Sequence, residues 1–347
     1  MNNVLYKKFG EVDLEDQFFK SLRDDYPGFD EWFHKKHGED AFVQYVDDRI
    51  TGFLYLKVEE EIVDDIDPVI KADKILKVGT FKIEAHGTKM GEQFVKGIMD
   101  YAINKDVDVC YVTIYEKHEE LIRLLQKFGF EFHGTKGSEG HKELVYLKHM
   151  RRITGDINKD YPVLNMNSAR KYMLSIYPQY HSILFPDSIL KTEDKGIISD
   201  ISYTNSIHKI YVCRMDNVEH LKYGDILVLY RTAEAGKTAE YNAVATSIAS
   251  VEEVKRQEEF NSFEEFYDYA CKYSVFDKND LRHWYNRGNC KAIKLTYNAA
   301  LKKRIVRHDL IETVGLERGR YWGFFELTDE QFETIAQLGG VRHIIAP

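Results

Sequence analysis

The chain has 347 residues, of which 44% are hydrophobic, and its 57 acidic against 48 basic residues give a net charge of −9. This length predicts two domains with full cores. The lack of any run of about 18 apolar residues excludes a membrane-spanning helix, and the N-terminal residues show no apolar signal region. The four cysteines are scattered without metal-ligand spacing, which indicates reduced thiols in a cytoplasmic protein and no metal site: Cys110, Cys213, Cys271 and Cys290.

The first elements along the chain are helical, and β-prone segments follow them. Residues 14–36 predict one or two helices, and residues 41–46 and 50–58 predict a hairpin. Residues 59–67 then hold six carboxylates. We interpret this run as a solvated loop, with an acidic rim that attracts a cationic amine as the alternative.

The net charge is divided unevenly between the two halves. Residues 1–150 contain 21 basic and 30 acidic residues, whereas residues 151–347 contain 27 of each. The whole excess of negative charge therefore belongs to the first half. An acidic surface disfavours a bare nucleic-acid backbone there.

Residues 77–130 carry the most informative pattern. A strand over 77–83 leads into a glycine-bearing turn, and a helix follows whose apolar residues recur at spacings of three and four. A strand over 107–114 and a second helix over 121–128 come next. A glycine turn at a helix start can hold a pyrophosphate, because free backbone N–H groups and the positive helix end point at it together. The apolar stripe of the first helix is Phe94, Val95, Ile98, Met99 and Ala102.

This stretch resembles the GNAT superfamily of N-acetyltransferases, which use acetyl-coenzyme A. Their hallmark, Gln/Arg-x-x-Gly-x-Gly/Ala, falls on residues 86–91, and their closing Tyr-x-x-x-Gly-Phe falls on residues 125–130. The resemblance covers about residues 1–148. It implies acetyl-CoA as the cofactor, bound by Phe81, Lys82, Ile83, His86, Gly87, Thr88, Lys89, Met90 and Gly91.

Four positions depart from that family's pattern. His86 stands where Gln or Arg is usual, Lys89 replaces the first glycine, and Leu125 replaces the tyrosine that protonates the departing thiolate. His118 lies near the position of a frequent Asn. Lys89 can attract phosphate, or it can be an ordinary surface lysine. These replacements keep open the alternative of a non-catalytic regulator with a degenerate acetyltransferase domain.

Acetyl transfer to an amine needs alignment of the two reactants, a donor for the developing oxyanion, and a base for the ammonium proton. A backbone N–H of the strand before the turn can act as that donor. Glu84 ends this strand, and Glu116 and His118 follow the next one, so all three share one edge of the sheet. We predict these three as catalytic residues. An ordinary surface or helix-start role is the alternative for each.

A domain boundary is expected near residue 150, where turn signals begin. We predict an acetyl-CoA-binding domain over 1–150, a linker and helix over 151–170, and a second domain over 171–347. Ser168 is a fair N-cap for a helix over 168–177. The later segments predict strands at 207–212, 222–232, 241–251 and 291–297, and helices at 262–272, 278–286 and 329–337.

The phrases at residues 208–211 and 224–231 resemble the PUA-like superfamily of small β-barrels, which includes ASCH and EVE domains. This resemblance implies binding of RNA or a modified nucleobase, by aromatic stacking with basic neighbours. A core role is the alternative for the tyrosines on strands. The neutral charge of this half restricts RNA to a local contact. The candidate residues are Tyr211, Tyr230, Arg231, Arg282, Trp284 and Arg287.

The expected fold class is α+β, with a GNAT-like mixed sheet flanked by helices, followed by a PUA-like small β-barrel domain with helices. Three functions are consistent with this sequence. The first is an N-acetyltransferase whose barrel recruits RNA, such as a charged tRNA with a free amine. The second is an acetyltransferase for a small amine or a protein or peptide lysine, with the barrel only as a scaffold or dimer surface. The third is the non-catalytic regulator, whose barrel reads nucleic acid.

Overall fold

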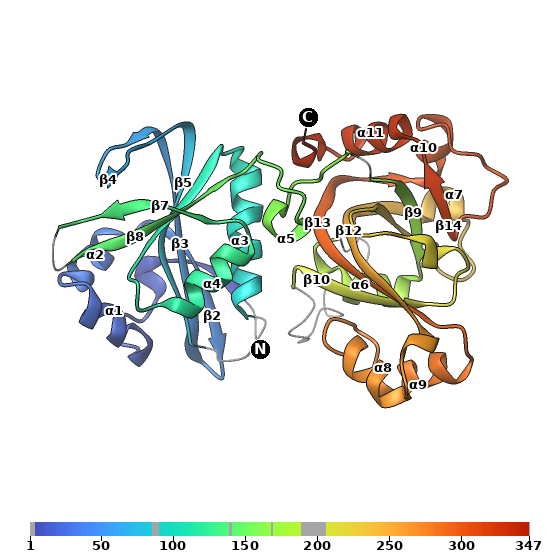
Figure 1. Cartoon of the computed structure of the whole chain (residues 1–347), viewed down its shortest axis with the longest axis horizontal. Helices are drawn as coiled ribbons and strands as arrows, with labels where there is room; N and C mark the ends of the chain where they lie inside the picture. Colours follow the sequence, from blue (N-terminus) through green and yellow to red (C-terminus); the bar gives the residue numbers. More distant parts are fainter. Residues whose placement is uncertain (1–3, 85–89, 139–140, 168, 189–205, 347) are drawn as a thin grey trace. The chain divides into compact units, whose positions relative to one another are not determined.

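The computed structural model describes residues 4–84, 90–138, 141–167, 169–188 and 206–346. The chain divides into two compact units, Met1–Met150 and Arg151–Pro347, called here the first and second unit. Each unit is built on one sheet that contains both parallel and antiparallel strand pairs, with helices around it (Figure 1). Among the described residues, no helix has the length and apolar character needed to cross a bilayer.

The first unit has an eight-stranded sheet in the order β1-β2-β3-β5-β6-β8-β7-β4. Within the described residues, β5 and β6 pair in parallel and the other recorded pairs are antiparallel. The strands are β1 (Val4–Lys8), β2 (Asp40–Val46), β3 (Arg49–Val63), β4 (Ile66–Asp67), β5 (Ile70–Ile83), β6 (Val109–Ile114), β7 (Glu131–Lys136) and β8 (Glu143–His149).

The helices of the first unit pack their apolar residues against this sheet. The predicted stripe from Phe94 to Ala102 is confirmed, since each of its five side chains is at most 1% exposed. A second cluster, rich in phenylalanine, includes Phe9, Phe19, Phe33 and Phe53. The helices are α1 (Lys20–Asp25), α2 (Phe29–Lys35), α3 (Met90–Lys105) and α4 (Glu119–Lys127).

The acidic run at residues 59–67 is not the solvated loop that we predicted. Glu59 to Glu61 belong to β3, which continues to Val63, and Asp67 belongs to β4. Glu59 accepts a hydrogen bond of 2.7 Å from the Tyr111 hydroxyl. Burial alone would raise the pKa of Glu59, but hydrogen bonds from Tyr111 and Lys57 hold it below its ordinary value. Part of the acidic run therefore belongs to the strands of the sheet, and Glu59 has a hydrogen-bond partner there.

The second unit has a six-stranded sheet in the order β10-β13-β12-β11-β9-β14. β9 and β11 are parallel, and the described residues include no pairing of β10 with β14 that would close the sheet, so the barrel stays a prediction. The strands are β9 (Lys171–Ile176), β10 (His208–Cys213), β11 (Ile226–Arg231), β12 (Val244–Arg256), β13 (Lys291–Val306) and β14 (Phe324–Leu327). The helices are α5 (Ile157–Asp160), α6 (Pro178–Leu184), α7 (Ala239–Asn242), α8 (Phe263–Ala270), α9 (Lys278–Asn286), α10 (Arg307–Glu312) and α11 (Asp329–Leu338).

The helix predicted over 168–177 is wrong, because Lys171–Ile176 form β9. All six residues of β9 are buried, and the strand lies between β11 and β14. A strand buried on both faces loses the apolar-polar alternation, and a short apolar run then resembles a helix segment. Ser168, the expected N-cap, lies outside the described residues.

Candidate functional site

The parallel strands β5 and β6 separate toward their C-terminal ends. In the part of the chain that the structure describes, their ladder joins only Ile75–Val78 with Val109–Val112. β5 nevertheless continues to Ile83, and it stays paired with β3 along its other edge up to that residue. Beyond Val78, the backbone N–H and C=O groups on the β5 edge that faces β6 therefore take no part in the ladder between these two strands. Such an edge can pair with an extended, amide-bearing ligand.

A β-bulge lies where this separation begins. Tyr55 of β3 pairs with Thr80, and the next residue, Leu56, pairs with Val78, so that Gly79 is the extra residue in β5. A bulge bends its strand and increases its twist, which accounts for the divergence of β5 from β6. Glycine is required here, because a Cβ at residue 79 would lie 2.6 Å from Tyr55 Cδ1.

Three of the predicted cofactor residues lie at the C-terminal end of β5. Phe81, Lys82 and Ile83 are half-buried, and the Phe81 ring packs on Phe94 of α3 with centroids 5.7 Å apart. Lys82 donates to the backbone carbonyl of Phe18 and lies over the Phe18 ring. These residues line the end of the strand, next to the start of α3.

The predicted turn is only partly described. His86, Gly87, Thr88 and Lys89 lie outside the described residues, whereas Met90 and Gly91 begin α3. Met90 is 7% exposed. A Cβ at Gly91 would lie 2.7 Å from Leu124 Cδ2 of α4, so close helix packing explains this glycine. A phosphate contact of Gly91 stays a prediction.

The predicted base Glu84 is engaged in an ion pair. Its Oε1 lies 2.8 Å from Lys82 Nζ, and its side chain is 46% exposed. Its backbone N–H donates to the Thr51 carbonyl, which fixes the end of β5. Glu84 must therefore leave Lys82 before it can accept a proton from a substrate.

The other two predicted catalytic residues follow β6, at the same edge of the sheet. Glu116 and His118 are both exposed, and His118 precedes α4 as its N-cap residue. His118 Nε2 lies 3.5 Å from Asp25 Oδ2, and Lys117 also pairs with Asp25. The Asp25 carboxylate thus orients the imidazole, which leaves His118 at the surface with a defined partner.

A tyrosine–carboxylate cluster adjoins this edge, and the sequence analysis missed it. The Tyr26 hydroxyl donates to Glu143 Oε1 at 3.0 Å, and the Tyr26 and Tyr115 ring centroids are 5.1 Å apart. Burial and the neighbouring Glu143 carboxylate raise the pKa of the Tyr26 phenol well above its usual range. Two aromatic rings beside a carboxylate suit a cationic amine. No local pattern could have revealed the pair, because its members are 117 residues apart.

The structure offers no candidate metal centre in the described part of the chain. No group of three or more His, Cys, Asp or Glu side chains there is arranged to hold a metal ion. All four cysteines are unbridged, and Cys110, Cys213 and Cys290 are buried.

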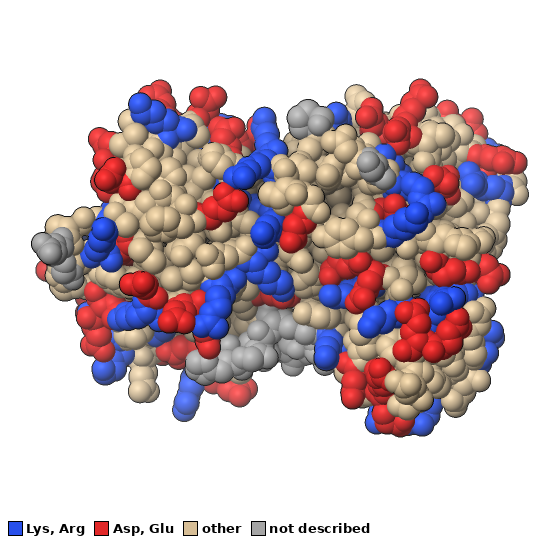
Figure 2. All heavy atoms as spheres, viewed as in Figure 1, with Lys and Arg blue, Asp and Glu red and all other residues tan. Residues whose placement is uncertain are grey.

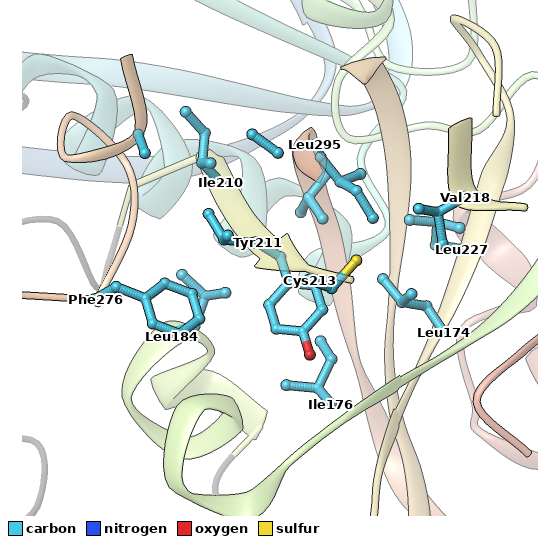
Figure 3. Packing of buried hydrophobic residues seen from close by; sticks show 14 of the residues in the cluster. Leu174, Ile176, Leu184, Ile210, Tyr211, Cys213, Val218, Leu227, Phe276 and Leu295 are labelled. Carbon is cyan, nitrogen blue, oxygen red and sulfur yellow. The ribbon is translucent and has the colours of Figure 1, made fainter. Parts of the chain in front are cut away.

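The predicted nucleic-acid residues do not form one surface. Tyr211 is 4% exposed, and its ring lies in the core of the second unit near Ile176 and Cys213 (Figure 3). Tyr230 is 1% exposed, and the buried Arg231 pairs with Glu234. Base contacts by these side chains would require opening of the core.

The α9 candidates are more accessible. Arg282 lies over the Phe263 ring at 4.1 Å and Arg287 near the Trp284 ring at 5.8 Å, and both arginines are exposed. The visible face of the second unit intersperses both signs of charge and shows no broad basic area (Figure 2). A nucleic-acid role for these residues stays a prediction.

No protein-family model and no curated protein matches this sequence. Solved structures with partial likeness include ASCH from Zymomonas mobilis, at 9% identity and a TM-score of 0.34, covering 49% of this chain and 95% of that one. NAA60 of Arabidopsis thaliana in complex with a bisubstrate analogue has 15% identity and a TM-score of 0.34, covering 42% and 98%. A GNAT family acetyltransferase from Elizabethkingia anophelis with acetyl-CoA bound has 11% identity and a TM-score of 0.30, covering 43% and 99%. At these TM-scores, the function proposed next must rest on the chain's own residues.

Proposed function

We propose that the first unit is an acetyl-CoA-dependent N-acetyltransferase that acts on a cationic primary amine. The observation that carries this proposal is the opening between β5 and β6, which begins at the Gly79 bulge and leaves one edge of β5 beyond Val78 outside the ladder. The pantetheine arm of coenzyme A is extended and contains amide groups. Such an arm can add to a strand edge as a peptide does.

Acetyl-CoA, when bound, supplies an activated thioester carbonyl. The chain's contribution begins with β5, whose free backbone N–H groups can hold the arm and donate to the carbonyl oxygen as negative charge develops there. The start of α3, at the end of the same strand, supplies a helix N-terminus suited to the pyrophosphate. Holding the two reactants in line is the main source of rate in such a reaction.

The amine side of the site is supported by the residues around the end of β6. Glu143 and Asp25 provide negative charge, and the Tyr26 and Tyr115 rings provide faces that attract an ammonium group. The charge excess of residues 1–150, with 30 acidic against 21 basic residues, agrees with a cationic acceptor.

A base must take one proton from the ammonium group before attack. His118 is the best supported of the three predicted bases, because Asp25 orients its ring and its side chain is 42% exposed. Glu84 would first have to break its ion pair with Lys82. Glu116 is exposed at the same edge.

Calorimetric titration of the full chain with acetyl-CoA tests the cofactor assignment. Lys89→Gln is expected to weaken binding about tenfold, the effect of removing one charge-assisted contact to phosphate. Lys105→Gln is the matched control, since it makes the same charge change at the other end of α3 and should have little effect. No binding by the wild-type chain would refute the proposal and favour the non-catalytic regulator.

Turnover with amine acceptors tests the second half of the proposal. Tyr26→Phe removes the hydroxyl bound to Glu143 but keeps the ring, so it should raise KM for the amine several-fold and leave acetyl-CoA affinity unchanged. Equal KM values for the variant and the wild type would place the acceptor elsewhere.

A further inference from the structure

Lys117 places an ammonium group of the chain itself on the amine side of the proposed site. Its Nζ forms an ion pair with Oδ1 of Asp25, the last residue of α1, and lies 5.8 Å from the ring centroid of Tyr115. A cation within about 6 Å of a ring centroid is attracted by the aromatic face. Lys117 therefore already makes the carboxylate contact and the ring contact by which this site would hold a cationic amine.

The groups around Tyr115 act together on its ring. Burial raises the pKa of the Tyr115 phenol, the Glu143 and Asp25 carboxylates raise this pKa further, and the Lys117 ammonium lowers it. The Tyr115 ring also packs on Tyr26, whose hydroxyl donates to Glu143. We call Asp25, Tyr26, Tyr115 and Glu143 the acceptor cluster, and Lys117 is the cation bound to it.

The Lys117 side chain can leave this position without opening the core. It is 58% exposed, whereas the Asp25 side chain is 13% exposed. An ion pair with one partner in solvent contributes only about 0.2–1 kcal/mol, so the flexible lysine stem can release Asp25 and turn. Lys117 follows β6 closely, at the edge of the sheet where β5 and β6 separate. The amine thus lies beside the opening proposed for the thioester.

The best supported base is the next residue along the chain. His118 Nε2 lies 3.5 Å from Asp25 Oδ2, and Lys117 pairs with the other oxygen of the same carboxylate. An amine nucleophile and a base for its proton therefore converge on Asp25. A proton has only a short path from the ammonium group to the imidazole, as general-base catalysis requires.

We propose that Lys117 is a self-acetylation site, at which the chain transfers the acetyl group of acetyl-CoA to its own Nζ. This inference rests on the N-acetyltransferase function proposed above. The ammonium group gives one proton to His118, and Nζ then attacks the thioester carbonyl carbon. The N–C bond forms as the C–S bond breaks, and the departing thiolate takes a second proton from the nitrogen. The products are an acetyl-lysine and coenzyme A, and His118 returns its proton to water.

Acetylation would change the affinity of the site for an external amine. An acetylated Lys117 has no charge, so it would release the Asp25 carboxylate and the face of Tyr115. A second ammonium group could then bind to the acceptor cluster without competition. The gain in affinity should be about two- to fivefold, the effect of removing one partly exposed ion pair.

The first test is incubation of the full chain with acetyl-CoA, followed by mass mapping of its peptides. Lys117 should be acetylated at least about tenfold faster than Lys20, because only Lys117 is held beside the thioester. Lys20 is the matched control, since it pairs with Asp24 on the same helix at 2.9 Å and is 70% exposed. Uncatalysed acetylation would favour this more exposed lysine. The rate per molecule should not depend on protein concentration, and a urea-unfolded chain should lose the preference.

The second test needs no acetyl-CoA. In an NMR titration at low salt, Lys117→Gln, which copies the neutral acetylated side chain, should bind n-butylammonium about two- to fivefold more tightly than the wild type. Lys20→Gln makes the same charge change on α1 and should leave this affinity unchanged. Lys117→Arg keeps the charge and cannot be acetylated at Nζ, so incubation with acetyl-CoA should not tighten its binding of n-butylammonium.

The outcomes separate this inference from the proposed function. Equal acetylation rates for Lys117 and Lys20, in a chain that binds acetyl-CoA and acetylates a free amine, would overturn the inference and leave the function in place. Equal affinity of Lys117→Gln and the wild type for n-butylammonium would also overturn it. So would a rate per molecule that rises with protein concentration, since the transfer would then occur between chains. A chain that does not bind acetyl-CoA would refute the function and the inference together.

Discussion

Replacement of Gly79 by alanine should destabilise the first unit and distort the opening between β5 and β6. The new Cβ would lie 2.6 Å from Tyr55 Cδ1, and that ring cannot move aside easily. Tyr55 is 3% exposed and packs edge-on against Phe9 and Trp32, at centroid distances of 5.2 and 6.0 Å. Overpacking of this kind costs about 1–3 kcal/mol, which corresponds to a fall in Tm of roughly 2–12 °C for a unit of this size.

Hydrogen exchange and thermal unfolding of Gly79→Ala check this expectation. Amides of β3 and β5 should exchange faster than in the wild type, and acetyl-CoA binding should weaken with them. Gly97→Ala is the matched control, because Gly97 lies inside α3 with nothing within 4 Å of a new Cβ. Alanine there should stabilise the helix by about 0.5–1 kcal/mol. A Gly79→Ala protein with wild-type exchange and Tm would refute the account of the bulge.

Three further outcomes are expected. Burial alone would raise the pKa of Glu252, but His208 and Lys294 hold this pKa at about 2, against an ordinary value of 4.5. The Glu252 carboxylate therefore stabilises the fold above pH 4.5, and this contribution is lost as the pH falls toward 2. Glu252→Gln should therefore flatten the loss of stability over this range in acid titrations, by about 3 kcal/mol in total. With a disulfide reagent, the native protein should show one rapidly reacting thiol, that of Cys271, because the other three cysteines are buried; Cys271→Ser should abolish the fast phase, and a second fast thiol would contradict the packing. Glu143→Gln should raise KM for a cationic amine with little change in kcat, and an unchanged KM would separate this carboxylate from the acceptor site.

The helices that the sequence predicted correctly are those with one apolar face. The stripe of α3 is buried as expected, and α9 spans Lys278–Asn286, the range predicted from its pattern. α11 begins at Asp329, after a Thr328 side chain that caps the Gln331 N–H. In each case, the information lies within one turn or two of the chain, where helix periodicity and capping act.

The errors occur where tertiary pairing decides the structure. Lys171–Ile176 became a strand because β11 and β14 occupy both of its edges, which a six-residue window cannot reveal. Glu59 lies in a strand because β3 still pairs with β5 there, with Glu59 opposite Ile75, and its carboxylate accepts a hydrogen bond from Tyr111, 52 residues away. Residues 324–327, which form β14, gave no strand signal in the sequence analysis.

In the candidate site, too, the sequence could assign positions set by local structure but not the partners set by tertiary contacts. Glu84, Glu116 and His118 could be assigned to one edge of the sheet, since parallel strands end together. The partners that define their chemistry could not be assigned, because Lys82, Asp25 and Glu143 reach the site through side-chain orientation or from distant segments.

The two glycines near the opening carry different information. Gly91 matches the family pattern, yet Leu124 of α4 already excludes a side chain there, so its presence would be expected in this helix pair without any ligand. A bulky residue at position 91 would displace α4 as well as a phosphate, and loss of binding could not be assigned to either cause. Gly79 lies outside the pattern, but its bulge separates β5 from β6 and exposes the strand edge. The strand, rather than the turn, is therefore where a substitution can distinguish a cofactor site from helix packing.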